Sequence, residues 1–209
     1  MLKLPKLKRF EIYAAIVAMS YILFFIFWFV FNKNKEFSFY AMGIIIMFFF
    51  FLYNIRRMNL SPFVLWGFVI VGFLHLFGGA IQIFGVRLYD LMSLNLIDLG
   101  GEFVLVKYDQ IIHFFSTFFA FLGLSQIYNE HAREEISKNK KEGFKNIYLV
   151  FLFAAFGISC TNEIVEFFPA YFWSDNGVGG YVNTILDLYA NFLGSLFGMV
   201  WLSFPFKRK

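Results

Sequence analysis

The chain of 209 residues has a single cysteine, Cys160, four prolines and only 15% charged residues. One cysteine excludes an internal disulfide, and the charged fraction falls well below the roughly 25% of soluble domains. Hydrophobic residues make up 60% of the chain, and phenylalanine alone supplies 34 residues. A soluble core of this size cannot bury so much apolar surface, so the lipid bilayer must be the main solvent. The composition therefore predicts a polytopic membrane protein and excludes a soluble enzyme, a nucleic-acid-binding protein and a secreted disulfide scaffold.

Six apolar runs are long enough to cross a bilayer core of about 30 Å, which takes about 20 helical residues. They occupy residues 10–31, 38–55, 62–84, 108–128, 146–168 and 183–204. The first run follows four basic residues, but it is too long for a signal peptide and no small-residue cleavage site follows it, so we expect it to remain as an anchor. The predicted fold is an all-α membrane protein, a bundle of about six transmembrane helices forming a single domain over residues 1–209.

The basic residues predict the orientation of this bundle. Of the 18 Lys and Arg residues, 14 fall in the N-terminal tail, at positions 56–57, between 133 and 145, or in the C-terminal tail. Cytoplasmic loops carry the excess of basic residues, so both termini are expected in the cytoplasm of a multi-pass cell-membrane protein. The long outer loop, 85–107, is rich in leucine, which suggests a short helix lying in the membrane interface.

Polar residues gather in the last three runs. They are Asp109, His113, Glu163, Glu166, Asp187 and Asn191. Ionisable groups inside a span cost about 2.5–3.5 kcal/mol each at the helix centre, so they normally face the protein interior and mark function. These residues form three pairs with spacings of three or four residues, so the two members of each pair share one helix face. The pairs are Asp109 and His113, Glu163 and Glu166, and Asp187 and Asn191. In the expected topology His113, Glu163, Glu166, Asp187 and Asn191 lie within about 15 Å of the outer surface, which predicts one outward-facing polar pocket.

The motifs of this pocket resemble those of a known family. They read Asp109-x-x-x-His113-Phe114, then Glu163 to Glu166, then Asp187-x-x-x-Asn191-x-x-Gly194-x-x-x-Gly198. This pattern resembles the VanZ-like superfamily of small integral membrane proteins, with a core over residues 62–204. The preceding His75, Gly78-Gly79 and Tyr89-Asp90 make the chain look more like the uncharacterised YjdF-like branch. The resemblance implies a cell-envelope protein of unsettled biochemical activity.

The first hypothesis for this pocket is a binding or transport protein. An acidic cluster would capture a small cation, a proton or an amine-bearing envelope ligand, with Asp109, Glu163, Asn191 and His75 as binding residues. Pro62, at the start of its run, is the only proline inside a predicted span, and no inverted repeat is evident. Both features speak against a transporter with alternating access.

The second hypothesis is an intramembrane enzyme that acts on a lipid or a lipid-linked envelope precursor. Imidazole and carboxylate groups can bind a divalent metal ion that activates water, or can divide acid and base roles. We expect His113, Glu166 and Asp187 as metal ligands or catalytic groups, with Asp109 orienting His113 and Asn191 hydrogen-bonding to the site. No basic clamp for a phosphate is evident, which speaks against this hypothesis.

The third hypothesis assigns the polar cluster to helix packing alone, with function residing in a partner. Gly194 and Gly198 continue the face of Asn191 and predict a close approach of the sixth span to the fourth or fifth. The sequence leaves the three hypotheses open.

Overall fold

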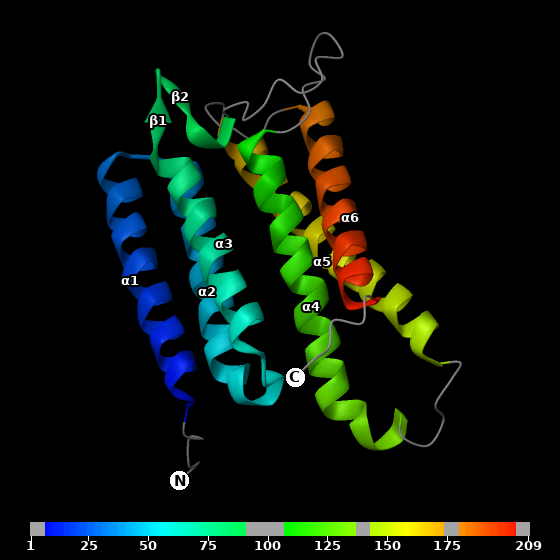
Figure 1. Ribbon diagram of the computed structural model, residues 1–209. Helices are drawn as coiled ribbons and strands as arrows, with labels where there is room; N and C mark the ends of the chain where they lie inside the picture. The colour runs from blue at the N-terminus through cyan, green and yellow to red at the C-terminus, as the bar shows by residue number, and fades with distance from the viewer. Residues whose placement is uncertain (1–6, 91–106, 137–142, 174–179, 204–209) are drawn as a thin grey trace.

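The computed structural model describes residues 7–90, 107–136, 143–173 and 180–203. Six α-helices and a small β-hairpin make up these residues (Figure 1). The elements are α1 (Arg9–Phe31), α2 (Lys35–Met58), α3 (Pro62–Ala80), β1 (Gln82–Ile83), β2 (Val86–Arg87), the 3-10 turn η1 (Leu88–Asp90), α4 (Tyr108–Ile136), α5 (Gly143–Phe172) and α6 (Tyr181–Ser203). All six helices contain segments long and apolar enough to cross a membrane, which confirms the predicted fold class.

Local sequence signals fix the boundaries of the first three helices. The side chain of Asn34 accepts a hydrogen bond from the backbone of Phe37 and caps α2. At the other end of α2, Asn59 adopts a left-handed conformation, which asparagine tolerates. Ser61 caps α3, and Pro62 occupies the first turn, where no backbone donor is needed. The connections between these helices are therefore only a few residues long.

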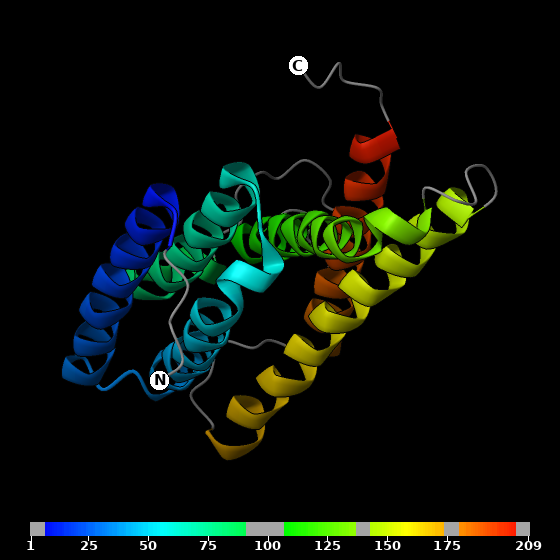
Figure 2. The ribbon, with the colours of Figure 1, turned by 90° about the horizontal axis from the view of Figure 1, so that it is seen from below.

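The helices pack around α4. One side of the bundle holds α1, α2 and α3, and α5 and α6 lie on the opposite side of α4 (Figure 2). Buried apolar side chains of all helices from α1 to α5 form one cluster, and those of α1, α2, α3 and η1 form a second. Large hydrophobic side chains cover the outside, among them Phe27, Phe50 and Phe167. A surface of this kind needs lipid as its solvent, which makes the bilayer the environment of the protein.

Helix α3 ends at Ala80, earlier than the predicted end at residue 84, because the chain turns into the hairpin. Gln82 pairs with Arg87 and Ile83 with Val86, and Phe84 and Gly85 form the turn with positive φ. The predicted interfacial helix of the 85–107 loop falls mostly outside the described residues. Of its leucines, Leu88 lies in the short turn η1.

Helices α4 and α5 extend beyond their predicted spans. The chain stays helical to Ile136 and again from Gly143, in the charged segment that the sequence assigned to a loop. Helix α5 also contains Pro169 and ends only at Phe172. A proline so near a helix end removes a single backbone hydrogen bond, so the helix continues for one more turn.

The sixth helix presses against the fourth. A Cβ atom added at Gly194 would collide with the backbone carbonyl of Phe114, and one added at Gly198 would meet the ring of Phe121. The glycines thus allow α6 to approach α4 at backbone distance, which settles which of the two neighbours the predicted stripe packs on. This contact brings the polar residues of both helices together.

Candidate functional site

The six predicted pocket residues meet at the end of the bundle that carries the hairpin. Helices α4 and α6 begin at this end and α5 finishes there (Figure 1). His113 is the centre of the group, and it lies about 8 Å along the axis from the start of α4. Its side chain is buried, with 6% exposure. The prediction that three helices share one polar cluster therefore describes the observed geometry.

The two ring nitrogens of His113 face carboxylates from different helices. Nε2 lies 3.1 Å from Oδ1 of Asp109, one turn earlier on α4, and 4.0 Å from Oε1 of Glu166 on α5. Nδ1 lies 3.3 Å from Oε1 of Glu163. The imidazole is therefore held between α4 and α5, with a negative group on each side of the ring.

Asn191 joins this centre to a deeper polar layer. Its amide nitrogen donates to Oε1 of Glu163 at 3.2 Å and lies 3.3 Å from Nδ1 of His113. Its amide oxygen accepts a hydrogen bond from Thr117, and Thr117 also contacts the hydroxyl of Ser159 at 2.6 Å. Thr117 lies one turn below His113 on α4, and this spacing is the signal that sequence reasoning missed. The layer forms a polar floor that links α4, α5 and α6.

Two further amides hold the remaining carboxylates. Asn162 donates to Oε1 of Glu166 at 2.6 Å, as the four-residue spacing predicts. Asn183 donates to Oδ2 of Asp187 at 2.6 Å, and its amide oxygen accepts from Nζ of Lys107 at 2.7 Å. Lys107 is thus a basic group at the rim of the site, which the sequence assigned only to a loop. No spacing pattern in the sequence predicts this contact, because the start of α4 determines the direction of the Lys107 side chain.

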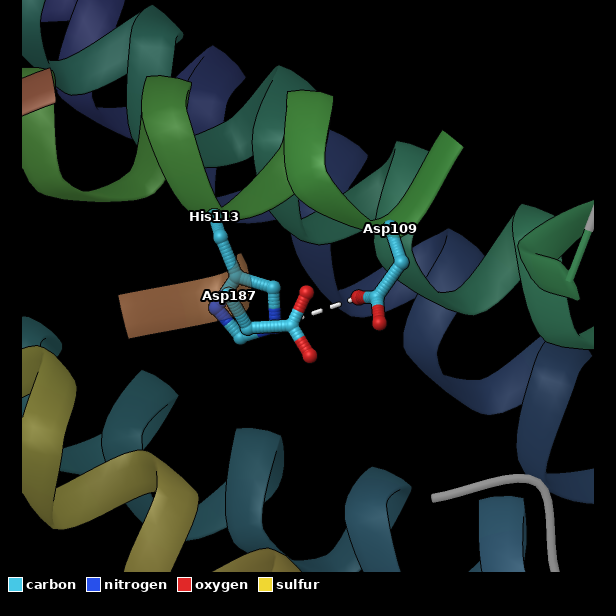
Figure 3. A group of neighbouring side chains, drawn as sticks. All are labelled: Asp109, His113 and Asp187. Atoms are coloured by element: carbon cyan, nitrogen blue, oxygen red, sulfur yellow. Dashed lines mark ion pairs between the residues drawn. The ribbon is translucent and has the colours of Figure 1, made fainter. Parts of the chain in front are cut away.

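Three buried atoms in this site have no hydrogen-bond partner among the described residues: Oδ1 of Asp109, Nε2 of His113 and Oδ1 of Asp187. The side chains of all three residues converge, with the Asp187 carboxylate beside the imidazole and Asp109 (Figure 3). One ligand-type atom from each residue lies within 4.8 Å of the others. Two of these atoms, Oδ1 of Asp109 and Nε2 of His113, face each other at 3.1 Å as an ion pair without hydrogen-bond geometry, and Oδ1 of Asp187 has no ion pair among the described residues. Buried polar atoms are almost always hydrogen-bonded, so this group requires an explanation.

The structure divides the candidate metal ligands differently from the sequence prediction. That prediction grouped His113, Glu166 and Asp187, with Asp109 only orienting the histidine. Among the residues that the structure describes, two groups have the spacing needed to hold one ion: Asp109, His113 and Asp187, and separately His113, Glu163 and Glu166. Asp109 is therefore a ligand candidate in its own right, and Glu166 belongs to the group that α5 completes.

His75 lies outside both groups. Its Nδ1 atom is 3.1 Å from the hydroxyl of Tyr89, and its ring packs against Phe37 and Tyr40. Tyr89, in η1, is the residue through which His75 reaches the site, because its hydroxyl also forms a hydrogen bond with Asp109. Burial, and beside it the negative charges of Asp109 and Glu166, raise the pKa of Tyr89 well above its usual range. The phenol therefore keeps its proton.

The site has a clear excess of acidic groups. Within the parts of the chain that the structure describes, the ion pairs of Asp109, Glu163 and Glu166 are all formed with His113. Asp187 forms no ion pair among these described residues, and its carboxylate accepts from the amide of Asn183, whose oxygen accepts from Lys107. Four carboxylates and one imidazole in a low-dielectric setting leave negative charge that protons or a bound cation must neutralise.

Comparison with known families gives one result. Residues 13–208 match the family described as "Predicted membrane protein (DUF2238)", and the chain belongs to this family. The match includes every residue of the site. No curated protein and no solved structure matches the chain.

Proposed function

We propose that this membrane protein binds a divalent transition-metal cation, such as Zn²⁺ or Mn²⁺, between α4 and α6. The observation that carries the proposal is the group formed by Asp109, His113 and Asp187, each of which has one buried side-chain atom without a hydrogen bond among the described residues. One imidazole nitrogen and two carboxylate oxygens are ligands that these metals accept. A bound ion would satisfy all three atoms at once and would neutralise two carboxylates.

The spacing of the three atoms suits a single ion. Two ligands of one zinc ion, each about 2.0–2.2 Å from it, can lie at most about 4.4 Å apart. One ligand atom from each of the three residues lies within 4.8 Å of the others, so small rotations of the side chains can bring three ligand atoms to a common centre.

The far side of His113 supports the same assignment. A histidine that binds a metal through one nitrogen almost always donates its second N–H to a carboxylate, a carbonyl or water. Nδ1 of His113 faces Oε1 of Glu163 at 3.3 Å, and Asn191 in turn donates to that oxygen. In this arrangement Nε2 binds the ion, and Glu163 fixes the tautomer and the orientation of the ring.

The direct test is the metal content of the purified full-length protein, measured by elemental analysis. We expect close to one ion per chain, and its loss in His113→Ala and in Asp187→Asn at equal folded yield. Glu11→Gln is the matched control, because Glu11 is a buried carboxylate in the first turn of α1 that accepts a hydrogen bond from the backbone of Lys8 and belongs to neither ligand group. A wild-type protein without metal, or variants that keep it, would overturn the proposal.

A second candidate function is metal-assisted hydrolysis of a lipid or lipid-linked envelope precursor. Three protein ligands leave a coordination position open for water, as in catalytic zinc sites. Glu166 has one oxygen 4.0 Å from Nε2 of His113, so its carboxylate is close enough to the three ligand residues to serve as a general base for a metal-bound water. Release of product from a radiolabelled lipid extract, dependent on both metal and Glu166, would favour this role over simple binding or transport of the cation.

The proposal includes a location for the site. Basic residues are in excess in both tails and in the connections from α2 to α3 and from α4 to α5, which favours cytoplasmic termini. The site would then lie in the outer half of a cell membrane. The motifs quoted in the sequence analysis also support a relationship to the VanZ-like superfamily. Capture of an amine-bearing ligand by the acidic residues is the alternative to metal binding that the same cluster of carboxylates supports.

A further inference from the structure

Tyr89 enters the bundle from the connection between α3 and α4 and lies next to the site. Its side chain is 8% exposed, although the residue belongs to a short turn outside the helices. Gly78 makes room for it, since a Cβ atom at this position would meet the rings of Tyr89 and Tyr108. The preceding hairpin is fixed at two points: Leu88 donates to the carbonyl of Ile81, and Arg87 pairs with Glu36 at 2.7 Å. Tyr89 is thus held in place from both sides.

The hydroxyl of Tyr89 connects His75 with Asp109. It lies 3.1 Å from Nδ1 of His75 on α3, and it forms a hydrogen bond with the carboxylate of Asp109 on α4. An ionised carboxylate only accepts hydrogen bonds, so the phenol donates its single proton to Asp109. The phenol oxygen then accepts from Nδ1–H of His75, which defines the tautomer of that ring.

From this geometry we propose that Tyr89 and His75 form a hydrogen-bonded support that fixes Asp109 as a metal ligand. The inference rests on the proposed function, because it assigns residues that position one ligand of the same ion. Oδ1 of Asp109 has no hydrogen-bond partner among the described residues, while its carboxylate is held by Tyr89. The support therefore restrains the carboxylate and leaves one oxygen directed at His113 and Asp187.

Packing alone does not require a polar atom on His75 or on Tyr89, and the proposed support explains why both side chains have one. His75 and Tyr89 sit among aromatic rings, with Phe37 at 6.1 Å and 5.5 Å from them respectively. Phenylalanine at either position would fill the same space without a polar atom to satisfy. Partners behind a metal ligand orient it, and their loss typically weakens metal binding by about 10–100-fold.

The experiment titrates the metal-stripped full-length protein in detergent with Zn²⁺ in competition with a chelating dye. We expect Tyr89→Phe to weaken Zn²⁺ binding by about 10–100-fold while its ring keeps the native packing. Tyr108→Phe is the matched control, because the hydroxyl of Tyr108 donates to the carbonyl of Leu74 and its ring lies 6.3 Å from that of Tyr89. This control should bind Zn²⁺ like the wild type.

Two further measurements separate positioning from general damage. The visible spectrum of bound Co²⁺ should change in Tyr89→Phe and stay unchanged in Tyr108→Phe, since it reports the geometry of the ligands. His75→Phe should weaken binding less than Tyr89→Phe and add nothing in the double variant, because His75 acts only through Tyr89. If Tyr89→Phe does not fold, weaker Zn²⁺ binding by His75→Phe supports the proposal and wild-type binding overturns it.

The outcomes distinguish this inference from the proposed function. A wild-type protein that binds no Zn²⁺ overturns both. If the wild type binds Zn²⁺ and Tyr89→Phe binds it equally well, or if Tyr108→Phe loses as much affinity, only the support by Tyr89 and His75 is overturned.

Discussion

Nε2 of His113 and Oδ1 of Asp109 lie 3.1 Å apart on consecutive turns of α4, and neither atom has a hydrogen-bond partner among the described residues. Two such groups in water would be hydrated, but here both are buried. An unmet hydrogen bond of a buried group costs about 1–3 kcal/mol. Oδ1 of Asp187 is also buried without a hydrogen-bond partner among the described residues, so three atoms that carry this free-energy cost lie at one place. A bound cation would coordinate all three atoms and offset this cost.

Metal binding should weaken as the pH falls. A metal takes up neutral imidazole and ionised carboxylates, so protons compete with it for His113, Asp109 and Asp187. We expect the apparent affinity for Zn²⁺ to drop by at least about tenfold between about pH 7.5 and about pH 5.5, with proton release on binding at the higher pH. Isothermal titration calorimetry in buffers of different ionisation enthalpy measures both effects. An affinity that does not change with pH would contradict ligation by these groups.

Glu163→Gln separates a metal site from a cluster that only fixes helix packing. Gln keeps the size of the side chain but cannot hold the second N–H of His113 as a carboxylate does. We expect about 10–100-fold weaker metal binding and an unchanged melting temperature of the metal-free protein. The packing hypothesis predicts the opposite, a lower melting temperature in the absence of metal. Thermal unfolding and Zn²⁺ titration of one preparation decide between the two.

Gly194→Ala should destabilise the bundle and weaken the site together. The new methyl group would collide with the carbonyl of Phe114 and push α6, with Asp187, away from α4. Overpacking of this kind typically costs about 1–3 kcal/mol. Gly157→Ala is the control, because Gly157 lies in α5 with open space around it and alanine favours helix. Equal melting temperatures for the two variants would argue against the close contact of α4 and α6.

The orientation of the protein is open to a direct test. A phosphatase reporter fused after Lys209 should stay inactive, because it folds only outside the cytoplasm, and a fluorescent reporter at the same place should be bright. The expectation follows from the distribution of Lys and Arg between the two sides. An active phosphatase would place both termini outside the cytoplasm, and the site would then lie in the cytoplasmic half of the membrane.

The sequence predicted most of the fold because the bilayer sets simple rules. Apolar runs of fixed length identified the six helices, and a spacing of four residues correctly paired Asp109 with His113. These are local properties of a helix, and they do not depend on how the helices pack. The same holds for the glycine stripe at Gly194, which predicted a close contact without naming the partner helix.

The grouping of the ligands depends on how the helices pack, so it could not be predicted from the sequence. Asp109 and Asp187 meet only because α6 approaches α4 at Gly194, and no spacing within one helix contains that information. Tyr89 reaches Asp109 from outside the helices, through a hairpin held by Arg87 and Glu36. Long-range contacts made by connecting segments leave little periodic signal in a sequence.

The central claim is that His113, Asp109 and Asp187 bind one metal ion, and X-ray absorption at the edge of the bound metal tests it most directly. If the metal is zinc, we predict a shell of nitrogen and oxygen atoms at about 2.0–2.2 Å, with the outer-shell scattering of one imidazole and no sulfur. The imidazole signal should disappear in His113→Ala. A spectrum with sulfur ligands, with no imidazole, or identical in wild type and His113→Ala would contradict the claim.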